Sequence, residues 1–408
     1  MSSDFNRISA FVESERERQI AFLAEMVRVP SDNPPGDCRP HAERAAELIE
    51  ALGFEVERHA VPEAFVRANG MVSATNLIVR HRFGDGPVVA LNAHGDVVPP
   101  GEGWTFDPYG AEIADGWMYG RGAAVSKSDF ATYVFALLAL KEIAAPLKGT
   151  VELHLTYDEE IGGAVGPGWL LSEGITKPDY VISAGFSYGV VNAHNGCLHL
   201  EVEVTGRSAH AAKPYTGVDA LEGATHILSA LYAWRGALAT RTSAIPGIGS
   251  PQMTVGLIRG GINTNVVPDR ITFRLDRRMI PEEKPEAVES ELRSVIAEAA
   301  KAFPEAHVDV RRILLAQPLT PTPDSERLSA IMCRHASEVM GVPVEAGGVP
   351  LYTDARLYAS AGIPTVLYGA GPRSIEEANA HRADERLPLA ELPKATEVIA
   401  RTLCELLS

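Results

Sequence analysis

Strand-like and helix-like segments alternate through the first half of the chain, and this alternation limits the possible folds more than any other feature. The strand-like segments are short and apolar, whereas the helix-like segments repeat apolar residues at helical spacing. The expected strands are residues 54–58, 76–81, 88–92, 151–157 and 180–183, and the expected helices are residues 4–28, 41–52 and 126–145. This order favours an α/β sandwich, in which helices cover both faces of a mainly parallel sheet.

The pattern changes near residue 190. It continues as a strand, a helix, two strands, a helix and a strand, at residues 197–206, 217–234, 252–259, 270–276, 285–302 and 307–313. That order is typical of a ferredoxin-like α+β unit. Because 408 residues exceed the usual size of a single core, we expect two domains. Residues 1–193 and 315–408 would form the first domain, and residues 194–314 would be inserted into it.

Charge and composition exclude several classes of protein. The formal net charge is −16 and no basic cluster is evident, which disfavours nucleic-acid binding. The chain has no run of eighteen apolar residues, and its polar start does not resemble a signal peptide. We therefore expect a cytoplasmic protein without a membrane partner.

The four cysteines are widely scattered, which predicts neither a disulfide framework nor a thiolate zinc site.

A candidate metal site follows two of the expected strands. His94 and Asp96 come after the strand at residues 88–92, and Glu159 and Glu160 come after the strand at residues 151–157. In a parallel sheet these side chains meet at one edge. A carboxylate near a histidine can orient its ring for metal binding, and an enclosed pair of carboxylates requires a compensating cation. A core histidine and a solvated acidic turn are the plain alternatives, and the combined pattern favours the metal site.

Six sequence blocks occur in the order that characterises a known family: His94-Gly-Asp96, Gly120-Arg-Gly122, Glu159-Glu160, Gly206-Arg-Ser-Ala-His210, Asp276-Arg-Arg278 and His381-Arg-Ala-Asp384-Glu385. The chain resembles the acetylornithine deacetylase, succinyl-diaminopimelate desuccinylase, aminoacylase-1 and carboxypeptidase G family nearly from end to end. The resemblance implies a zinc-exopeptidase-like catalytic domain at residues 1–193 and 315–408. It also implies that the insert is a lid and dimerisation domain, so that the protein is a homodimer.

The resemblance assigns roles to residues of the catalytic domain. Glu159 would be the base that deprotonates the attacking water, and Asp96 would orient His94. The expected metal ligands are His94, Glu160 and His381. In isolation His381 would be interpreted as a surface histidine, and only its match to the last block of the family makes it a candidate ligand.

The resemblance also assigns roles to the insert. His210 would reach the active site of the partner subunit and polarise the scissile carbonyl, whereas Asn265 and Arg278 would hold the carboxylate of the substrate. Arg277 remains an alternative to Arg278, because adjacent strand residues face opposite sides of a sheet. His210 could instead simply cap its own loop.

Two positions depart from the family pattern. Val125 and Gly185 stand where the family has carboxylate ligands of the metal that His94 serves. Asp129 is a poor substitute, because four residues along a helix shift it by about 6 Å. His194 and Asn195 are somewhat better candidates, although a hinge between the domains is the stronger explanation of His194. We therefore expect one ion, zinc in the first place and manganese or cobalt as alternatives.

The sequence thus predicts a metal-dependent hydrolase that cleaves an amide C–N bond in a small carboxylate-bearing substrate. An N-acyl amino acid or a dipeptide-like compound would fit. The alternatives are a degenerate family member that binds a small carboxylate without metal catalysis, and an enzyme that hydrolyses a different C–N bond with a single metal.

Overall fold

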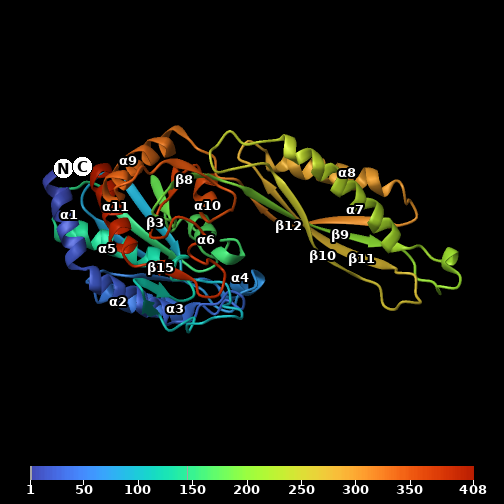
Figure 1. The fold of residues 1–408 in the computed structure, drawn as a ribbon, viewed down its shortest axis with the longest axis horizontal. Coiled ribbons are helices and arrows are strands. Elements are labelled where there is room, and N and C mark those ends of the chain that lie inside the picture. The colour runs from blue at the N-terminus through green and yellow to red at the C-terminus, as the bar shows by residue number, and fades with distance from the viewer. Residues whose placement is uncertain (1, 145) are drawn as a thin grey trace. The chain divides into compact units, whose positions relative to one another are not determined.

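The computed structural model describes residues 2–144 and 146–408. The chain divides into two compact units (Figure 1). Unit 1 comprises residues 1–192, 321–347 and 353–408, and unit 2 comprises residues 193–320 and 348–352. No helix in the described part of the chain is both long enough and apolar enough to cross a membrane.

The core of unit 1 is built on an eight-stranded sheet with the order β1-β2-β6-β3-β7-β14-β8-β13. Its inner strands β6, β3, β7 and β14 are mutually parallel, whereas β1, β2 and β8 pair antiparallel with their neighbours. This mainly parallel sheet confirms the expected fold class. The strands are β1 (Glu57–Ala60), β2 (Thr75–Arg82), β3 (Val88–His94), β6 (Thr150–Thr156), β7 (Tyr180–Ser183), β8 (Val190–His194), β13 (Ala346–Val349) and β14 (Thr365–Leu367).

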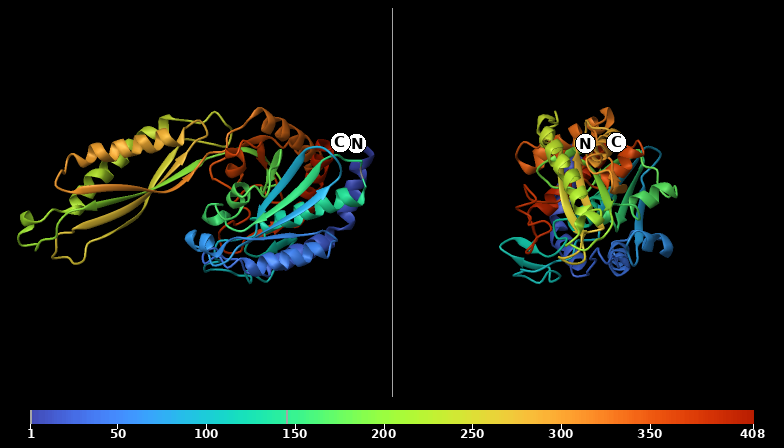
Figure 2. Two further views of the ribbon diagram at one scale, coloured as in Figure 1. Left: turned by 180° about the vertical axis from the view of Figure 1, so that it is seen from behind. Right: turned by 90° about the vertical axis from the view of Figure 1, so that its right-hand side faces the viewer.

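Helices cover both faces of this sheet. The larger apolar cluster joins one face to α1 (Ser2–Ser14), α2 (Arg16–Val27), α3 (Arg39–Glu50), α5 (Lys127–Glu142), α9 (Pro323–Met340) and α11 (Glu391–Leu406). A smaller cluster on the other face joins Ala90 and Val181 to Tyr358 of α10 (Ala355–Ser360) and to Leu171 of α6 (Pro167–Ser172). Figure 2 shows that both termini lie side by side, where α1 packs against α11.

The prediction of one continuous opening helix over residues 4–28 is wrong, because the structure has two helices there. The chain turns at Glu15 and forms α1 and α2 as separate helices. Each helix then buries its own apolar residues, Ile8 and Val12 in α1 and Phe22 and Leu23 in α2. The helical spacing of apolar residues continues across the turn at Glu15, so the sequence pattern does not show where the first helix ends.

Short elements complete unit 1. A three-stranded sheet pairs β15 (Arg386–Pro388) with β5 (Trp117–Tyr119) and β5 with β4 (Glu112–Ala114). The helix α4 (Glu63–Ala68) precedes β2, and a single 3₁₀ turn spans Glu159–Ile161. Strand β5 ends directly before the loop of residues 120–126, and β15 begins directly after the loop that ends at residue 385. The pairing of β5 with β15 therefore brings these two loops together.

Unit 2 has the expected β-α-β-β-α-β order. Its antiparallel sheet runs β10-β11-β9-β12, with β9 (Gly196–Thr205), β10 (Gln252–Gly260), β11 (Arg270–Met279) and β12 (His307–Ala316). The helices α7 (Ala220–Gly236) and α8 (Pro285–Ala300) pack on one face (Figure 2), where every second residue of β9 is fully buried. Two 3₁₀ turns, Pro214–Thr216 and Ala237–Thr240, flank α7.

Candidate metal centre

His94 is the last residue of β3 and lies at the carboxyl edge of the parallel sheet of unit 1. It pairs in register with Thr156, the last residue of β6, and is only 6 % exposed. Its Nδ1 lies 3.0 Å from the backbone oxygen of Asp96 and 3.5 Å from the Asp96 carboxylate. Both contacts hold the same nitrogen, so Nε2 is the nitrogen that can bind a cation.

Asp96 is fully buried and connects His94 to the next strand of the sheet. Its carboxylate accepts hydrogen bonds from the backbone N–H groups of Glu159 at 3.2 Å and Glu160 at 3.3 Å, and from Asn33 Nδ2 at 3.0 Å. One side chain therefore fixes both the imidazole ring and the turn that carries the two glutamates.

The turn after β6 directs Glu159 and Glu160 toward His94. Asp158 anchors it, because the Asp158 carboxylate accepts hydrogen bonds from the backbone N–H groups of Val165 and Gly166. Gly163 has a φ of +70°, and a Cβ there would lie 2.1 Å from Asp354 Oδ1. Only glycine therefore fits, and the sharp turn brings ligand atoms of His94, Glu159 and Glu160 within 4.8 Å of one another.

The electrostatics of this group favour a bound cation. Burial, together with the charges of Glu160 and Asp96, raises the pKa of Glu159 to about 7 despite the opposing effect of His94. Burial alone would lower the pKa of His94, but the hydrogen bond to Asp96 and the charges of Glu159 and Glu160 raise it well above its ordinary value. Both shifts reflect a concentration of negative charge that a divalent cation would compensate.

His381 also belongs to this group. Its Nε2 lies 3.2 Å from Glu160 Oε1, and its side chain is 52 % exposed. The loop that carries it is fixed by the fully buried ion pair of Glu385 and Arg121, whose charged atoms lie 2.6 Å apart. Glu385 also accepts hydrogen bonds at 3.2 Å from the backbone N–H groups of Ala124 and Val125. The structure therefore joins His381, predicted from the last sequence block, to Glu160.

The two positions that lack family ligands are occupied in ways that exclude a direct replacement. Val125 has an apolar side chain that packs against the core of unit 1. A Cβ at Gly185 would lie 2.8 Å from the backbone nitrogen of Tyr368, so a side chain does not fit there. Asp129 accepts hydrogen bonds from the backbone N–H groups of Ala370, at 3.0 Å, and Gly185. Burial raises its pKa well above the ordinary value, which fits a structural carboxyl.

Sequence reasoning missed Asp354, a second buried acid beside the turn of Glu159. Asp354 is 3 % exposed and neither carboxylate oxygen has a hydrogen-bond partner among the described residues. Burial and the charge of Glu159 raise the pKa of Asp354 to about 8. Arg356 lies 3.9 Å from it and donates a hydrogen bond to the backbone oxygen of Gly162. The sequence Thr353-Asp-Ala shows that an acidic residue is present, but only the fold shows that this residue lies beside Glu159.

The residues predicted to bind substrate all lie in unit 2. His210 and Asn265 are exposed and lie on adjacent loops, which are joined by a hydrogen bond of 3.0 Å from Ala211 N to Asn265 O.

Arg277 is fully buried beside Trp234 and donates to Glu283 at 2.6 Å. Arg278 lies on the opposite face of the sheet, so Arg278 is the arginine with an accessible guanidinium, although it pairs with Asp276 at 2.9 Å. His194, the other candidate ligand, also belongs to unit 2, where its Nδ1 lies 2.9 Å from Asn195 O.

The parallel sheet with histidine and carboxylates at its carboxyl edge, and the inserted antiparallel unit, define a two-unit metallo-hydrolase. Residues 90–405 match the Peptidase family M20/M25/M40, and the chain belongs to this family. This confirms the family predicted from the motifs. The chain is 28% identical to an acetylornithine deacetylase of Myxococcus xanthus over 89% of this chain and 91% of the relative. It is 27% identical to aminoacylase-1A of Rattus norvegicus over 95% of each chain.

Solved structures share the same fold. Aminopeptidase PepT from Bacillus cereus superposes with a TM-score of 0.74 at 24% identity, over 96% of this chain and 98% of that one. Human carnosine dipeptidase 1 superposes with a TM-score of 0.73 at 15% identity, over 98% of each chain. The family membership makes this protein a hydrolase of C–N bonds that depends on metal, and the residues at the edge of its sheet fit a divalent cation.

Proposed function

We propose that the protein hydrolyses an amide bond in a small carboxylate-bearing substrate, such as an N-acyl amino acid or a dipeptide-like compound. The observation that carries the proposal is the convergence of His94, Glu159 and Glu160 within 4.8 Å at the carboxyl edge of the sheet. Similarity to an acetylornithine deacetylase and to aminoacylase-1A supports this class of substrate.

The proposed metal ligands are His94, Glu160 and His381. Two histidines and one glutamate form a known catalytic zinc set, and manganese or cobalt would suit the same donors. Because Val125 and Gly185 supply no donor atom, we propose a single ion. When bound, such a cation supplies Lewis-acid chemistry that makes a water molecule nucleophilic at neutral pH.

The residues of the chain would then position the substrate and move one proton. Glu159 takes a proton from the attacking water and returns it to the leaving amine, a task suited to a carboxylate that lies beside the proposed ligands His94 and Glu160. Asp96 keeps His94 in the tautomer that leaves Nε2 as the ligand. In unit 2, Arg278 and Asn265 would hold the substrate carboxylate, and His210 would donate to the developing oxyanion.

A homodimer through unit 2 is part of the proposal. β10 lies at the edge of the four-stranded sheet, and most of its residues are exposed, including the apolar Leu257 and Ile258. An exposed apolar edge strand is a natural pairing surface for a second copy of the chain. Pairing of two β10 strands would bury this edge.

The first test is the variant Glu159→Gln, assayed with a panel of N-acyl amino acids in the presence of zinc, manganese or cobalt. We expect kcat to fall by about 10²- to 10⁴-fold, because the proton acceptor is lost while the metal ligands remain. Metal content per chain should be unchanged. The control is Glu63→Gln, an exposed glutamate of α4 that should leave kcat unaffected. Full turnover by Glu159→Gln would contradict the mechanism.

A binding protein without metal catalysis is the second candidate, and the replacement of two family ligands by Val125 and Gly185 favours it. Chelation separates the two candidates. Unchanged affinity for an N-acyl amino acid in chelator, together with no turnover under any metal, would support the binding protein. Turnover that disappears in chelator and returns with metal would support the hydrolase.

A further inference from the structure

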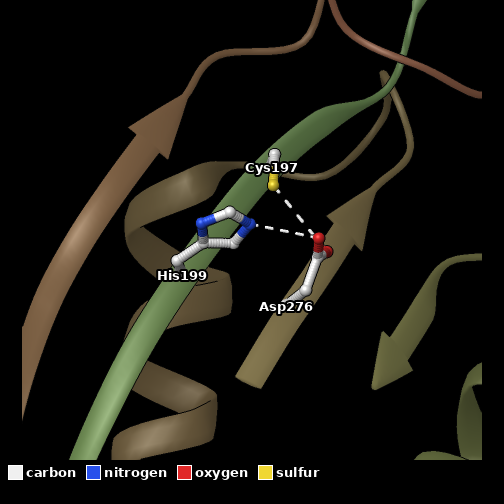
Figure 3. A group of neighbouring side chains, drawn as sticks. All are labelled: Cys197, His199 and Asp276. Carbon is white, nitrogen blue, oxygen red and sulfur yellow. Dashed lines mark hydrogen bonds and ion pairs between the residues drawn. The ribbon is translucent and has the colours of Figure 1, made fainter. Parts of the chain in front are cut away.

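A second group of metal-binding side chains lies in unit 2, on the face of its sheet that the helices leave uncovered. Cys197 and His199 belong to β9, and Asp276 and Arg278 belong to the neighbouring strand β11. The strand register places His199 opposite Asp276 and Cys197 opposite Arg278. Side chains paired directly or diagonally across antiparallel strands on one face lie close together. The backbone itself therefore brings Cys197, His199 and Asp276 together (Figure 3).

Two distances within the group, each to a different oxygen of Asp276, are close to ligand–ligand distances in a zinc site. Nε2 of His199 lies 3.1 Å from Asp276 Oδ2, and Sγ of Cys197 lies 3.7 Å from Asp276 Oδ1 (Figure 3). Ligand atoms of all three residues lie within 4.8 Å of one another. In a tetrahedral zinc site, bond lengths of about 2.0 to 2.3 Å place neighbouring nitrogen and oxygen ligands about 3.3 Å apart, and sulfur and oxygen ligands about 3.6 Å apart.

We propose that Cys197, His199 and Asp276 form a binding site for a thiophilic divalent cation of the zinc class. A thiolate and an imidazole select zinc or cobalt over magnesium and calcium, which prefer oxygen ligands. Binding replaces the thiol proton of Cys197 by the metal and releases that proton to solvent. His199 binds in its neutral form, and the fourth coordination position stays open to water. Its three ligands all belong to unit 2, whereas the proposed catalytic centre lies in unit 1.

Arg278 is the competitor for this cation. Its Nε and Nη2 donate to both oxygens of Asp276, at 2.9 and 3.1 Å, and its guanidinium lies 5.3 Å from the ring centre of Tyr352. The side chains of Asp276 and Arg278 are each about one third exposed. An ion pair exposed to this extent is worth little, so a cation held by two further ligands can take one carboxylate oxygen from it.

The test is a cobalt titration of the full-length protein followed by absorption spectroscopy. A cysteine ligand produces a thiolate-to-cobalt charge-transfer band in the near ultraviolet, whereas the candidate centre in unit 1 contains no sulfur. We expect this band in the wild type and its loss in Cys197→Ser. The matched control is Cys333→Ser, because Cys333 lies in α9 outside any group of metal-binding residues in the described part of the chain. It should keep the band.

Two further variants protect the test against misfolding of the Cys197 variant. His199 is 34% exposed, so His199→Gln should fold and bind cobalt at least about tenfold more weakly. Arg278→Gln should bind cobalt about fivefold more tightly, because it releases Asp276 from the ion pair. Absence of the band in wild type at saturating cobalt, or its persistence in Cys197→Ser, would overturn the proposal. Unchanged affinity in both His199→Gln and Arg278→Gln would do the same.

Discussion

At the scale of single residues, Asp354 and Glu159 are two acids that the fold holds out of water. Burial and the charges of Glu160 and Asp96 raise the pKa of Glu159 to about 7, and burial and the charge of Glu159 raise the pKa of Asp354 to about 8. The folded, metal-free protein therefore binds more protons than the unfolded chain between the ordinary carboxyl pKa values and pH 7 to 8. The stability from these groups is fully present below about pH 4 and is lost as the pH rises through 7 and 8.

We therefore predict that Asp354→Asn makes the free energy of unfolding less dependent on pH, when both proteins are kept metal-free with a chelator. The amide stays neutral, so the variant should gain about 1 to 3 kcal/mol over the wild type at pH 8 and little at pH 5. Urea unfolding of both proteins at several pH values measures the difference, and other titrating groups are common to both. A constant difference across this range would mean that Asp354 is not protonated in the folded protein.

The sequence predicted part of the candidate site at this scale. His94 ends a strand and Asp96, Glu159 and Glu160 follow strands, so local pattern alone is enough to predict that they lie at one edge of the sheet. The choice between Arg277 and Arg278 could not be made, because it depends on which face of β11 the helices cover. Cys197, His199 and Asp276 were not grouped either, since almost eighty residues separate Cys197 from Asp276 and only the register of β9 and β11 joins them.

At the scale of elements, the pairing of β5 with β15 holds the loop of residues 120–126 against the loop of His381. The buried ion pair of Arg121 and Glu385 fixes this junction, and both side chains are only 1% exposed. Glu385→Ala should destabilise the protein by about 3 to 5 kcal/mol, because it leaves the Arg121 guanidinium buried without a partner. Glu63→Ala removes an exposed partner of Arg67 and should change the free energy of unfolding by less than about 1 kcal/mol. Urea unfolding compares the two, and similar losses would contradict the assigned role of the junction.

The pattern of helices and strands was easier to predict than their ends and the short elements. Strands β2, β3 and β6 and both helices of unit 2 follow their predicted ranges closely, because long periodic segments carry a strong signal. The three-residue strands β4, β5 and β15 carry almost none, yet they build the junction beside His381. Likewise, β1 begins at Glu57, three residues later than predicted, and the buried Phe54 lies before the strand.

At the scale of the whole molecule, the segment of residues 348–352 belongs to unit 2, although residues 353–408 return to unit 1. The backbone explains this, because Gly348 N donates to Pro246 O at 2.8 Å and Asn195 N donates to Val349 O at 3.3 Å. Nothing in the sequence of this segment distinguishes it from its neighbours. Tyr352, which packs against Arg278, therefore reaches unit 2 from a part of the chain that was predicted to lie in the catalytic domain.

The proposed homodimer leads to a prediction about mixed subunits. If His210 acts in the active site of the partner subunit, Glu159→Gln and His210→Ala chains are each inactive alone, but a mixed dimer keeps one complete site. Random reassociation of equal amounts makes half of the dimers mixed, so the mixture should recover about a quarter of the wild-type activity. A mixture of Glu159→Gln with Glu160→Gln chains should recover none, because Glu159 and Glu160 belong to the same turn and every site then carries a defect. If the His210→Ala mixture also stays inactive, His210 serves its own chain, and full activity of His210→Ala chains alone would place His210 outside the reaction.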